Sequence, residues 1–88
     1  MKKMKFSGRE LTVLRAIGLG LGATGAEIEE KTRIQSSELC EIVQSLMDAG
    51  FVETNPAAQS FANEAFLTTN FEVNPGYAQE LKVAIRRA

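Results

Sequence analysis

The sequence predicts a mainly helical α+β fold, and three patterns lead to this prediction. The pattern Ser/Thr-x-x-Glu, which is typical of helix starts, occurs at Ser7 and again at Thr24. Residues 39–47 carry apolar side chains at the spacing of one helix face. Residues 66–73 instead alternate between apolar and polar side chains, as a half-buried strand does. A chain of 88 residues is long enough to bury a modest core without disulfides or metal.

The first two helices are expected to follow the two capping boxes. After a basic tail at residues 1–6, a helix is predicted over residues 8–18, where apolar residues recur at helical spacing. Residues 18–25 are too rich in glycine to continue it, so they are expected to form a loop with at most a short strand. A short second helix is predicted over residues 25–32.

The third helix is predicted over residues 36–49, with Ser36 as its N-cap. Gly50 supplies the left-handed residue that ends it. Its apolar face is formed by Leu39, Ile42, Val43, Leu46 and Met47. Cys40 lies beside this stripe, so we expect a half-exposed thiol. Its neighbours Glu38 and Glu41 disfavour a thiolate, which favours a passive thiol over a redox sensor.

Residues 51–73 are predicted to form a β-hairpin. Its strands are expected at residues 51–55 and 66–73, with a long loop near residues 56–65. In the second strand, Leu67, Thr69, Phe71 and Val73 would share one side, and Phe66, Thr68, Asn70 and Glu72 the other. Two interpretations of Phe61 and Phe66 remain open: they fold back onto the core, or they form an apolar surface for a partner.

A last helix is predicted over residues 75–87. Asn74 is expected to cap it, and Pro75 suits the first position of a helix because its missing N–H has no partner there. Its inward stripe is expected to consist of Tyr77, Leu81, Ala84 and Ile85.

Charge is divided unevenly along the chain, although the net charge is only −1. Residues 1–33 carry a net charge of +3 and residues 34–88 a net charge of −4. Between Ile34 and Leu81 there are seven acidic residues and no lysine or arginine. An anionic partner would therefore meet the ends of the chain before its middle.

Several classes of function are not expected from this composition. The chain has one cysteine and no histidine, so we expect no metal site, no cofactor, no small-molecule substrate and no enzymatic activity. The GxGxxG pattern at residues 20–25 lacks a preceding strand, which favours a loop over a nucleotide site. Charged residues interrupt every apolar stretch, so no membrane segment is expected and a cytoplasmic location is the default.

The order of helix, short helix, turn, striped helix, hairpin and helix resembles the winged helix-turn-helix domains of bacterial and archaeal transcriptional regulators. The most specific part is residues 24–53, which end Ala-Gly-Phe-Val-Glu. Positions that the family fills with apolar residues or glycine are occupied by Ile28, Ile34, Leu39, Val43, Leu46, Gly50 and Val52. The resemblance implies one winged-helix domain over residues 1–88. Two departures concern the turn: Glu29 replaces a small residue, and Arg33 a frequent glycine.

The resemblance also implies double-stranded DNA as the partner, with the third helix in the major groove. Polar side chains there would contact bases, and basic ones phosphates. The candidate residues before and on this helix are Lys31, Arg33, Gln35, Ser36, Ser37, Glu41, Gln44 and Ser45. The candidates elsewhere are Lys2, Lys3 and Lys5 in the tail and Asn55, Gln59 and Asn63 in the wing.

Two functions remain open from the sequence. The first is a DNA-binding transcriptional regulator, acting as a homodimer through its first and last helices. The second is a protein-protein interaction module whose acidic third helix and wing bind a basic protein partner. Glu38 and Glu41 favour the second, because they would repel phosphates.

Overall fold

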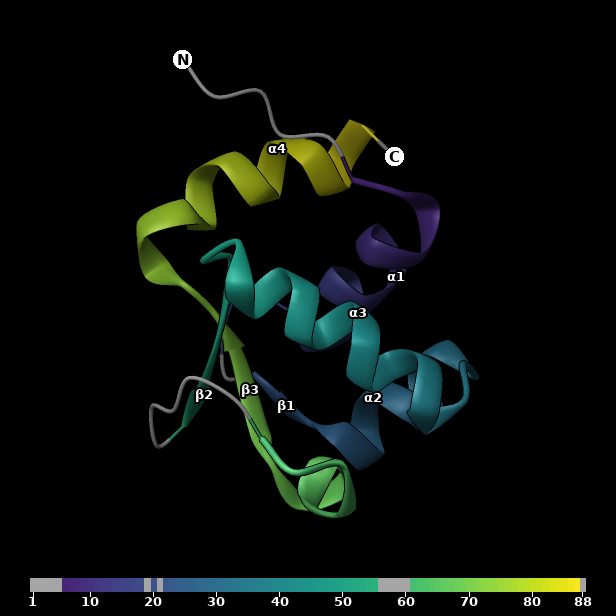
Figure 1. The fold of residues 1–88 in the computed structure, drawn as a ribbon. Helices are drawn as coiled ribbons and strands as arrows, with labels where there is room; N and C mark the ends of the chain where they lie inside the picture. Colours follow the sequence, from purple (N-terminus) through teal and green to yellow (C-terminus); the bar gives the residue numbers. More distant parts are fainter. Residues whose placement is uncertain (1–5, 19, 21, 56–60, 88) are drawn as a thin grey trace.

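The computed structural model describes residues 6–18, 20, 22–55 and 61–87 (Figure 1). It has the predicted mainly helical α+β fold with a three-stranded antiparallel sheet. In chain order the elements are α1 (Gly8–Ile17), β1 (Ala23–Thr24), α2 (Gly25–Thr32), α3 (Ser36–Asp48), β2 (Val52–Asn55), η1 (Asn63–Thr68), β3 (Asn70–Val73), η2 (Pro75–Tyr77) and α4 (Ala78–Arg87). In the part of the chain that is described, no helix is long and apolar enough to cross a membrane.

The first two helices begin at the predicted capping boxes. The Ser7 N–H donates to Glu10 Oε1 at 2.8 Å, and the Glu10 N–H donates back to Ser7 Oγ at 3.2 Å. Thr24 and Glu27 exchange the same pair of hydrogen bonds, at 2.8 and 3.2 Å. These contacts satisfy backbone N–H groups that a helix start leaves free.

The start of α3 differs from the prediction. Gln35, and not Ser36, is the N-cap, and its side chain forms no capping hydrogen bond. Ser36 is already the first helical residue. The reason is the conformation of Gln35, whose φ of −61° and ψ of 145° are extended, while its carbonyl accepts the first helical hydrogen bond from the Leu39 N–H at 2.9 Å.

β3 is the central strand of the sheet, in the order β1-β3-β2. Phe71 of β3 lies opposite Ala23 on one side and Thr54 on the other. The glycine-rich segment thus contributes the short strand β1. The two strands of the predicted hairpin, β2 and β3, are adjacent and antiparallel.

The prediction of a strand over residues 66–73 is wrong for its first half. β3 begins only at Asn70, and the preceding residues form the 3-10 helix η1. Phe66 is fully buried and Leu67 is exposed, the reverse of what an extended strand would give. The physical reason is a close approach to the start of α2, where a Cβ on Gly25 would overlap the Phe66 carbonyl oxygen. Tertiary packing therefore overrides the alternating pattern.

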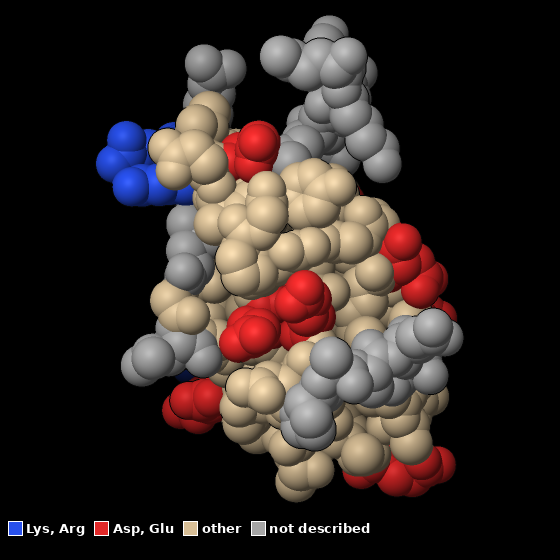
Figure 2. All heavy atoms as spheres, turned by 90° about the vertical axis from the view of Figure 1, so that its left-hand side faces the viewer, with Lys and Arg blue, Asp and Glu red and all other residues tan. Residues whose placement is uncertain are grey.

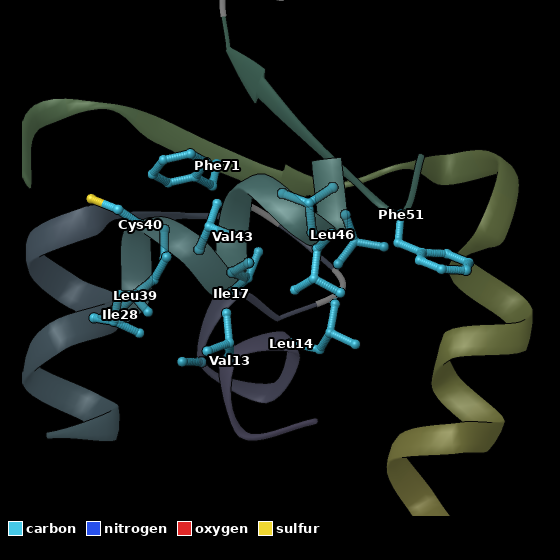
Figure 3. Close-up of a cluster of buried hydrophobic side chains, with 14 of the residues drawn as sticks. Val13, Leu14, Ile17, Ile28, Leu39, Cys40, Val43, Leu46, Phe51 and Phe71 are labelled. Carbon is cyan, nitrogen blue, oxygen red and sulfur yellow. The ribbon is translucent and has the colours of Figure 1, made fainter. Parts of the chain in front are cut away.

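The core lies between α1, α3 and the sheet. Figure 3 shows side chains from α1, α2 and α3 gathered in one cluster beneath β3, with Val43 of α3 next to the Phe71 ring. Val13, Leu14 and Ile17 of α1 are buried there. The Phe61 ring also folds inward, with its centroid 5.6 Å from that of Phe66 and 5.3 Å from that of Phe71. Of the two interpretations of Phe61 and Phe66, folding back onto the core is confirmed for Phe66, whereas Phe61 packs against the core and stays partly exposed.

α4 is attached to the rest of the fold at both of its ends. Asn74 caps η2 by accepting the Gly76 N–H at 2.9 Å, and its Nδ2 donates to the Gly50 carbonyl at 2.9 Å. Toward the other end, Arg15 Nη2 donates to the Ile85 carbonyl at 3.1 Å. Leu81 is fully buried between these contacts. α4 therefore packs against α1, at the end of the molecule opposite η1 (Figure 1).

Candidate nucleic-acid interface

α3 presents one polar face to solvent, as the resemblance implied. Ser37, Glu41, Ser45 and Asp48 are exposed along it at helical spacing. The opposite face is buried through Leu39, Val43 and Leu46. The same helix therefore supplies both the core and an outward surface that a ligand can reach.

A groove runs beside this polar face, between α3 and the residues that precede and begin η1. We call it the α3 groove, and its volume is about 580 Å³. Its lining consists of Ser37, Cys40, Glu41, Gln44, Ser45, Asp48, Phe61 and Asn63. The fold thus brings together four candidate residues of the third helix and one candidate of the wing, Asn63.

Gln44 is engaged within its own helix. Its Nε2 donates to Asp48 Oδ1 at 2.9 Å, which is a contact between residues one turn apart. A base contact by Gln44 would have to compete with this hydrogen bond. Ser37 and Ser45 are exposed and carry short hydroxyl side chains that can donate and accept.

Arg33 stands at the corner between α2 and α3. It is the C-cap of α2 and has a left-handed backbone with φ of +60°, the conformation for which glycine is favoured at a turn. Its N–H donates to the Glu29 carbonyl at 2.8 Å, and its side chain is exposed. A positive charge therefore stands next to the start of α3.

Lys31 is directed elsewhere. Its Nζ lies 3.4 Å from the Ala16 carbonyl, near the end of α1. That carbonyl belongs to the last turn of α1, where the helix dipole attracts a cation. The ammonium group of Lys31 is thus occupied at the end of α1.

Arg9 is a residue that sequence reasoning missed. From the first turn of α1 it forms an ion pair with Glu38 in the first turn of α3. Both side chains are largely exposed, so the pair adds little stability. It does neutralise one of the two glutamates that would repel a phosphate. No local pattern predicts this contact, because the two residues belong to different helices.

The wing strands carry negative charge. Glu53 of β2 and Glu72 of β3 are directly opposite each other, an arrangement that is unfavourable for two like charges. Figure 2 shows the side of the molecule that carries β2, where acidic side chains lie near the middle and the visible basic side chains gather mainly at the upper edge. Asn55 is exposed at the end of β2. Gln59 and the tail residues Lys2, Lys3 and Lys5 lie outside the described residues.

Cys40 is buried, which corrects the prediction of a half-exposed thiol. Only 8% of the residue is exposed, and burial raises the pKa of its thiol above the usual 9.0. The prediction failed because α3 packs against η1 as well as against the core, which widens its buried face. In Figure 3 the sulfur points away from Val43 and Phe71. Among the described residues, no group of His, Cys, Asp and Glu is arranged to hold a metal ion.

Comparison with known proteins found one family. A model of the MarR family matches residues 5–59, which is more than half of the chain. The match covers α1, α2, α3 and β2, including the polar face of α3. Neither the search of curated proteins nor that of solved structures found a match.

Proposed function

This chain belongs to the MarR family of winged helix-turn-helix domains, and from that premise we propose that it binds double-stranded DNA as a transcriptional regulator in the cytoplasm. The observation that carries the proposal is the exposed polar face of α3. Its serines, Ser37 and Ser45, are short enough to let the helix approach the floor of the major groove, and their hydroxyls can contact base edges.

The start of α3 supports the contacts to the DNA backbone. Arg33 and Arg9 both stand near this end, on different helices. The helix start itself has no side-chain cap, so its N–H groups and the positive end of its dipole are available to a phosphate. DNA would therefore be held at the first turn of α3, with Glu41 and Asp48 farther along the helix and away from the phosphates.

The small number of cations supports binding as a homodimer. We propose that two copies associate through α1 and α4, which contact each other at one end of the molecule. A dimer doubles the phosphate contacts and matches the two-fold symmetry of paired half-sites. The tail residues Lys2, Lys3 and Lys5 would add further contacts to the backbone.

The proposal is tested by titrating mixed-sequence duplex DNA at rising salt, beginning at about 20 mM, where attraction to phosphates is strongest. We expect binding that weakens with salt. Arg33→Ala should weaken it on every sequence and reduce the slope of log K against log salt by about one for each bound subunit. Lys82→Ala is the matched control, because Lys82 is exposed and its loss removes the same charge. Since Lys82 lies on α4, analytical ultracentrifugation of this variant checks that the proposed dimer is retained.

The two variants distinguish a contact made at the start of α3 from an effect of the protein's net charge. Equal losses in Arg33→Ala and Lys82→Ala would mean that net charge, and not the start of α3, drives the binding. An absence of binding at about 20 mM salt would exclude DNA as the partner.

A further inference from the structure

We infer that the α3 groove is a docking site for an arginine-containing segment of a basic protein partner. This deepens the proposed function, because it concerns regulation at the same face, but the site does not require that DNA be bound. The sequence places a basic partner on the third helix and the wing, and the inference narrows that location to the α3 groove.

The first argument is uncompensated charge. Glu41 and Asp48 are both exposed at the groove, and no lysine or arginine of the described residues forms an ion pair with either. Arg9 stands near the start of α3, but it is paired with Glu38. The groove therefore carries two carboxylates that a basic ligand can neutralise and that a DNA phosphate would avoid.

The second argument is an apolar wall next to those carboxylates. Phe61 lines the groove, and its ring is held by contacts with Phe66 and Phe71. Cys40 supplies a buried, uncharged part of the lining. A guanidinium suits this combination, since it stacks on aromatic rings and pairs with carboxylates through two parallel hydrogen bonds. The ammonium group of lysine is not planar, so it can neither stack on a ring in this way nor form two parallel hydrogen bonds with a carboxylate.

The third argument concerns spacing. Glu41 and Asp48 are seven residues apart on one helix, which corresponds to a rise of about 10.5 Å. In a segment with polyproline II conformation, which has three residues per turn, side chains three residues apart lie on the same side and are separated by about 9 Å. A segment of the form Arg-x-x-Arg could therefore reach both carboxylates. Gln44 donates to only one oxygen of Asp48, so the other oxygen is left for such a ligand.

The size of the groove is consistent with a short segment. Its volume of about 580 Å³ lies within the range of sites that hold small ligands, so it can hold a few residues and not a folded domain. A segment bound there would cover the face that has to enter the major groove. Binding of the partner and of DNA would then exclude each other.

The inference is tested with a fluorescein-labelled Arg-Ala-Ala-Arg peptide and the full chain, by fluorescence anisotropy at about 20 mM and 150 mM salt. The double variant Glu41→Gln/Asp48→Asn should bind the peptide about tenfold more weakly, since it loses both charge-assisted contacts. Glu30→Gln/Glu80→Gln removes the same charge from exposed positions on α2 and α4, and it should bind like the wild type. A Lys-Ala-Ala-Lys peptide should bind more weakly than the arginine peptide.

Three results would overturn the inference. The first is equal weakening in both double variants, which would mean that only net charge matters. The second is unchanged binding in Glu41→Gln/Asp48→Asn. The third is equal affinity for the lysine peptide, which would remove the reason to assign arginine.

The only cysteine of the chain gives a second measurement, because Cys40 lines the groove. The bound arginine peptide should slow alkylation of Cys40 by iodoacetamide, followed by mass spectrometry at alkaline pH. Peptide binding without this protection would put the peptide elsewhere and overturn the inference. Neither measurement contains DNA, so a duplex that fails to bind affects only the proposed function. Conversely, DNA binding without peptide binding would overturn only this inference.

Discussion

Arg33 ends α2 with a backbone φ of +60°, and no other non-glycine residue in the described part of the chain has a positive φ. For a residue with a Cβ, this conformation costs about 1 to 2 kcal/mol relative to the right-handed one. Glycine would avoid most of that cost. Strain of this kind is often retained where the side chain has a function, and the exposed guanidinium beside α3 is such a candidate.

At this position we predict that stability and DNA binding change in opposite directions. Arg33→Gly should raise the free energy of unfolding by up to about 1 kcal/mol, because relief of strain exceeds the added entropy of the unfolded chain. The same variant should bind duplex DNA more weakly, because a phosphate contact is lost. Urea unfolding and a DNA titration on the same sample measure the two effects.

Arg33→Ala serves as the control, since it removes the charge but keeps the Cβ and hence the strain. It should bind DNA as weakly as Arg33→Gly without the gain in stability. If Arg33→Gly binds DNA as the wild type does, the role proposed for Arg33 is wrong.

Among the secondary-structure elements, the start of α2 is fixed from two directions. Thr24 belongs to β1, where it lies opposite Asn70, and it is also the N-cap of α2. The next N–H, that of Gly25, donates to the Thr69 carbonyl at 3.1 Å. The capping box therefore couples the helix-turn-helix unit to the sheet, and loosening it should loosen both.

The capping box predicts a pH dependence of stability. The pKa of Glu27 is lowered from its usual 4.5, chiefly by the backbone hydrogen bond from Thr24, then by that of the Thr24 side chain and by the charge of Lys31. A carboxylate with a lowered pKa in the folded state contributes stability above its unfolded value, and this contribution is lost as the pH falls through the folded value. Thermal unfolding midpoints can be measured from pH 6 downward. They should begin to decrease once the pH is below about 4.5.

In Glu27→Gln the unfolding midpoint should decrease less between pH 6 and low pH than in the wild type, because the amide of glutamine does not titrate. Glu30→Gln is the control on the same helix, since Glu30 is exposed and the described residues include no hydrogen-bond partner for its side chain. The control should give a curve parallel to that of the wild type. A curve for Glu27→Gln that is also parallel would contradict the prediction.

At the scale of the whole molecule, two large apolar side chains are exposed among the described residues, and they lie on different elements. Val83 on α4 is 45% exposed, and Leu67 on η1 is 44% exposed. α4 and η1 occupy opposite ends of the fold (Figure 1). Val83 therefore tests the proposed dimer surface, and Leu67 is a similarly exposed control position away from that surface.

We predict that Val83→Glu shifts the protein from dimer to monomer, because a buried, unpaired carboxylate in the interface is costly. Leu67→Glu should leave the dimer intact. Analytical ultracentrifugation of both variants at matched concentrations measures the difference. A monomeric wild type at about 100 µM would reject the dimer, since an interface that weak falls outside the range expected of a stable one.

Local patterns predicted the helices well. The capping boxes at Ser7 and Thr24 act within four residues of the chain, and the apolar stripe of α3 requires only regular helix geometry, so neither depends on distant parts of the sequence. The same patterns were enough to indicate a polar α3 face and to assign the fold class. They also identified the turn at Arg33 as unusual.

Contacts between distant segments decided the rest. The approach of Gly25 to Phe66 accompanies the change of half of a predicted strand into η1, and η1 in turn packs against α3, the helix that carries the buried Cys40. The same kind of contact brought Arg9 to Glu38 and formed the α3 groove around Glu41. Such contacts depend on which surfaces meet after folding, and periodicity within one segment carries no information about its neighbours in space. For this protein, the helical scaffold follows from local sequence, whereas the charge and shape of its candidate binding face follow from tertiary packing.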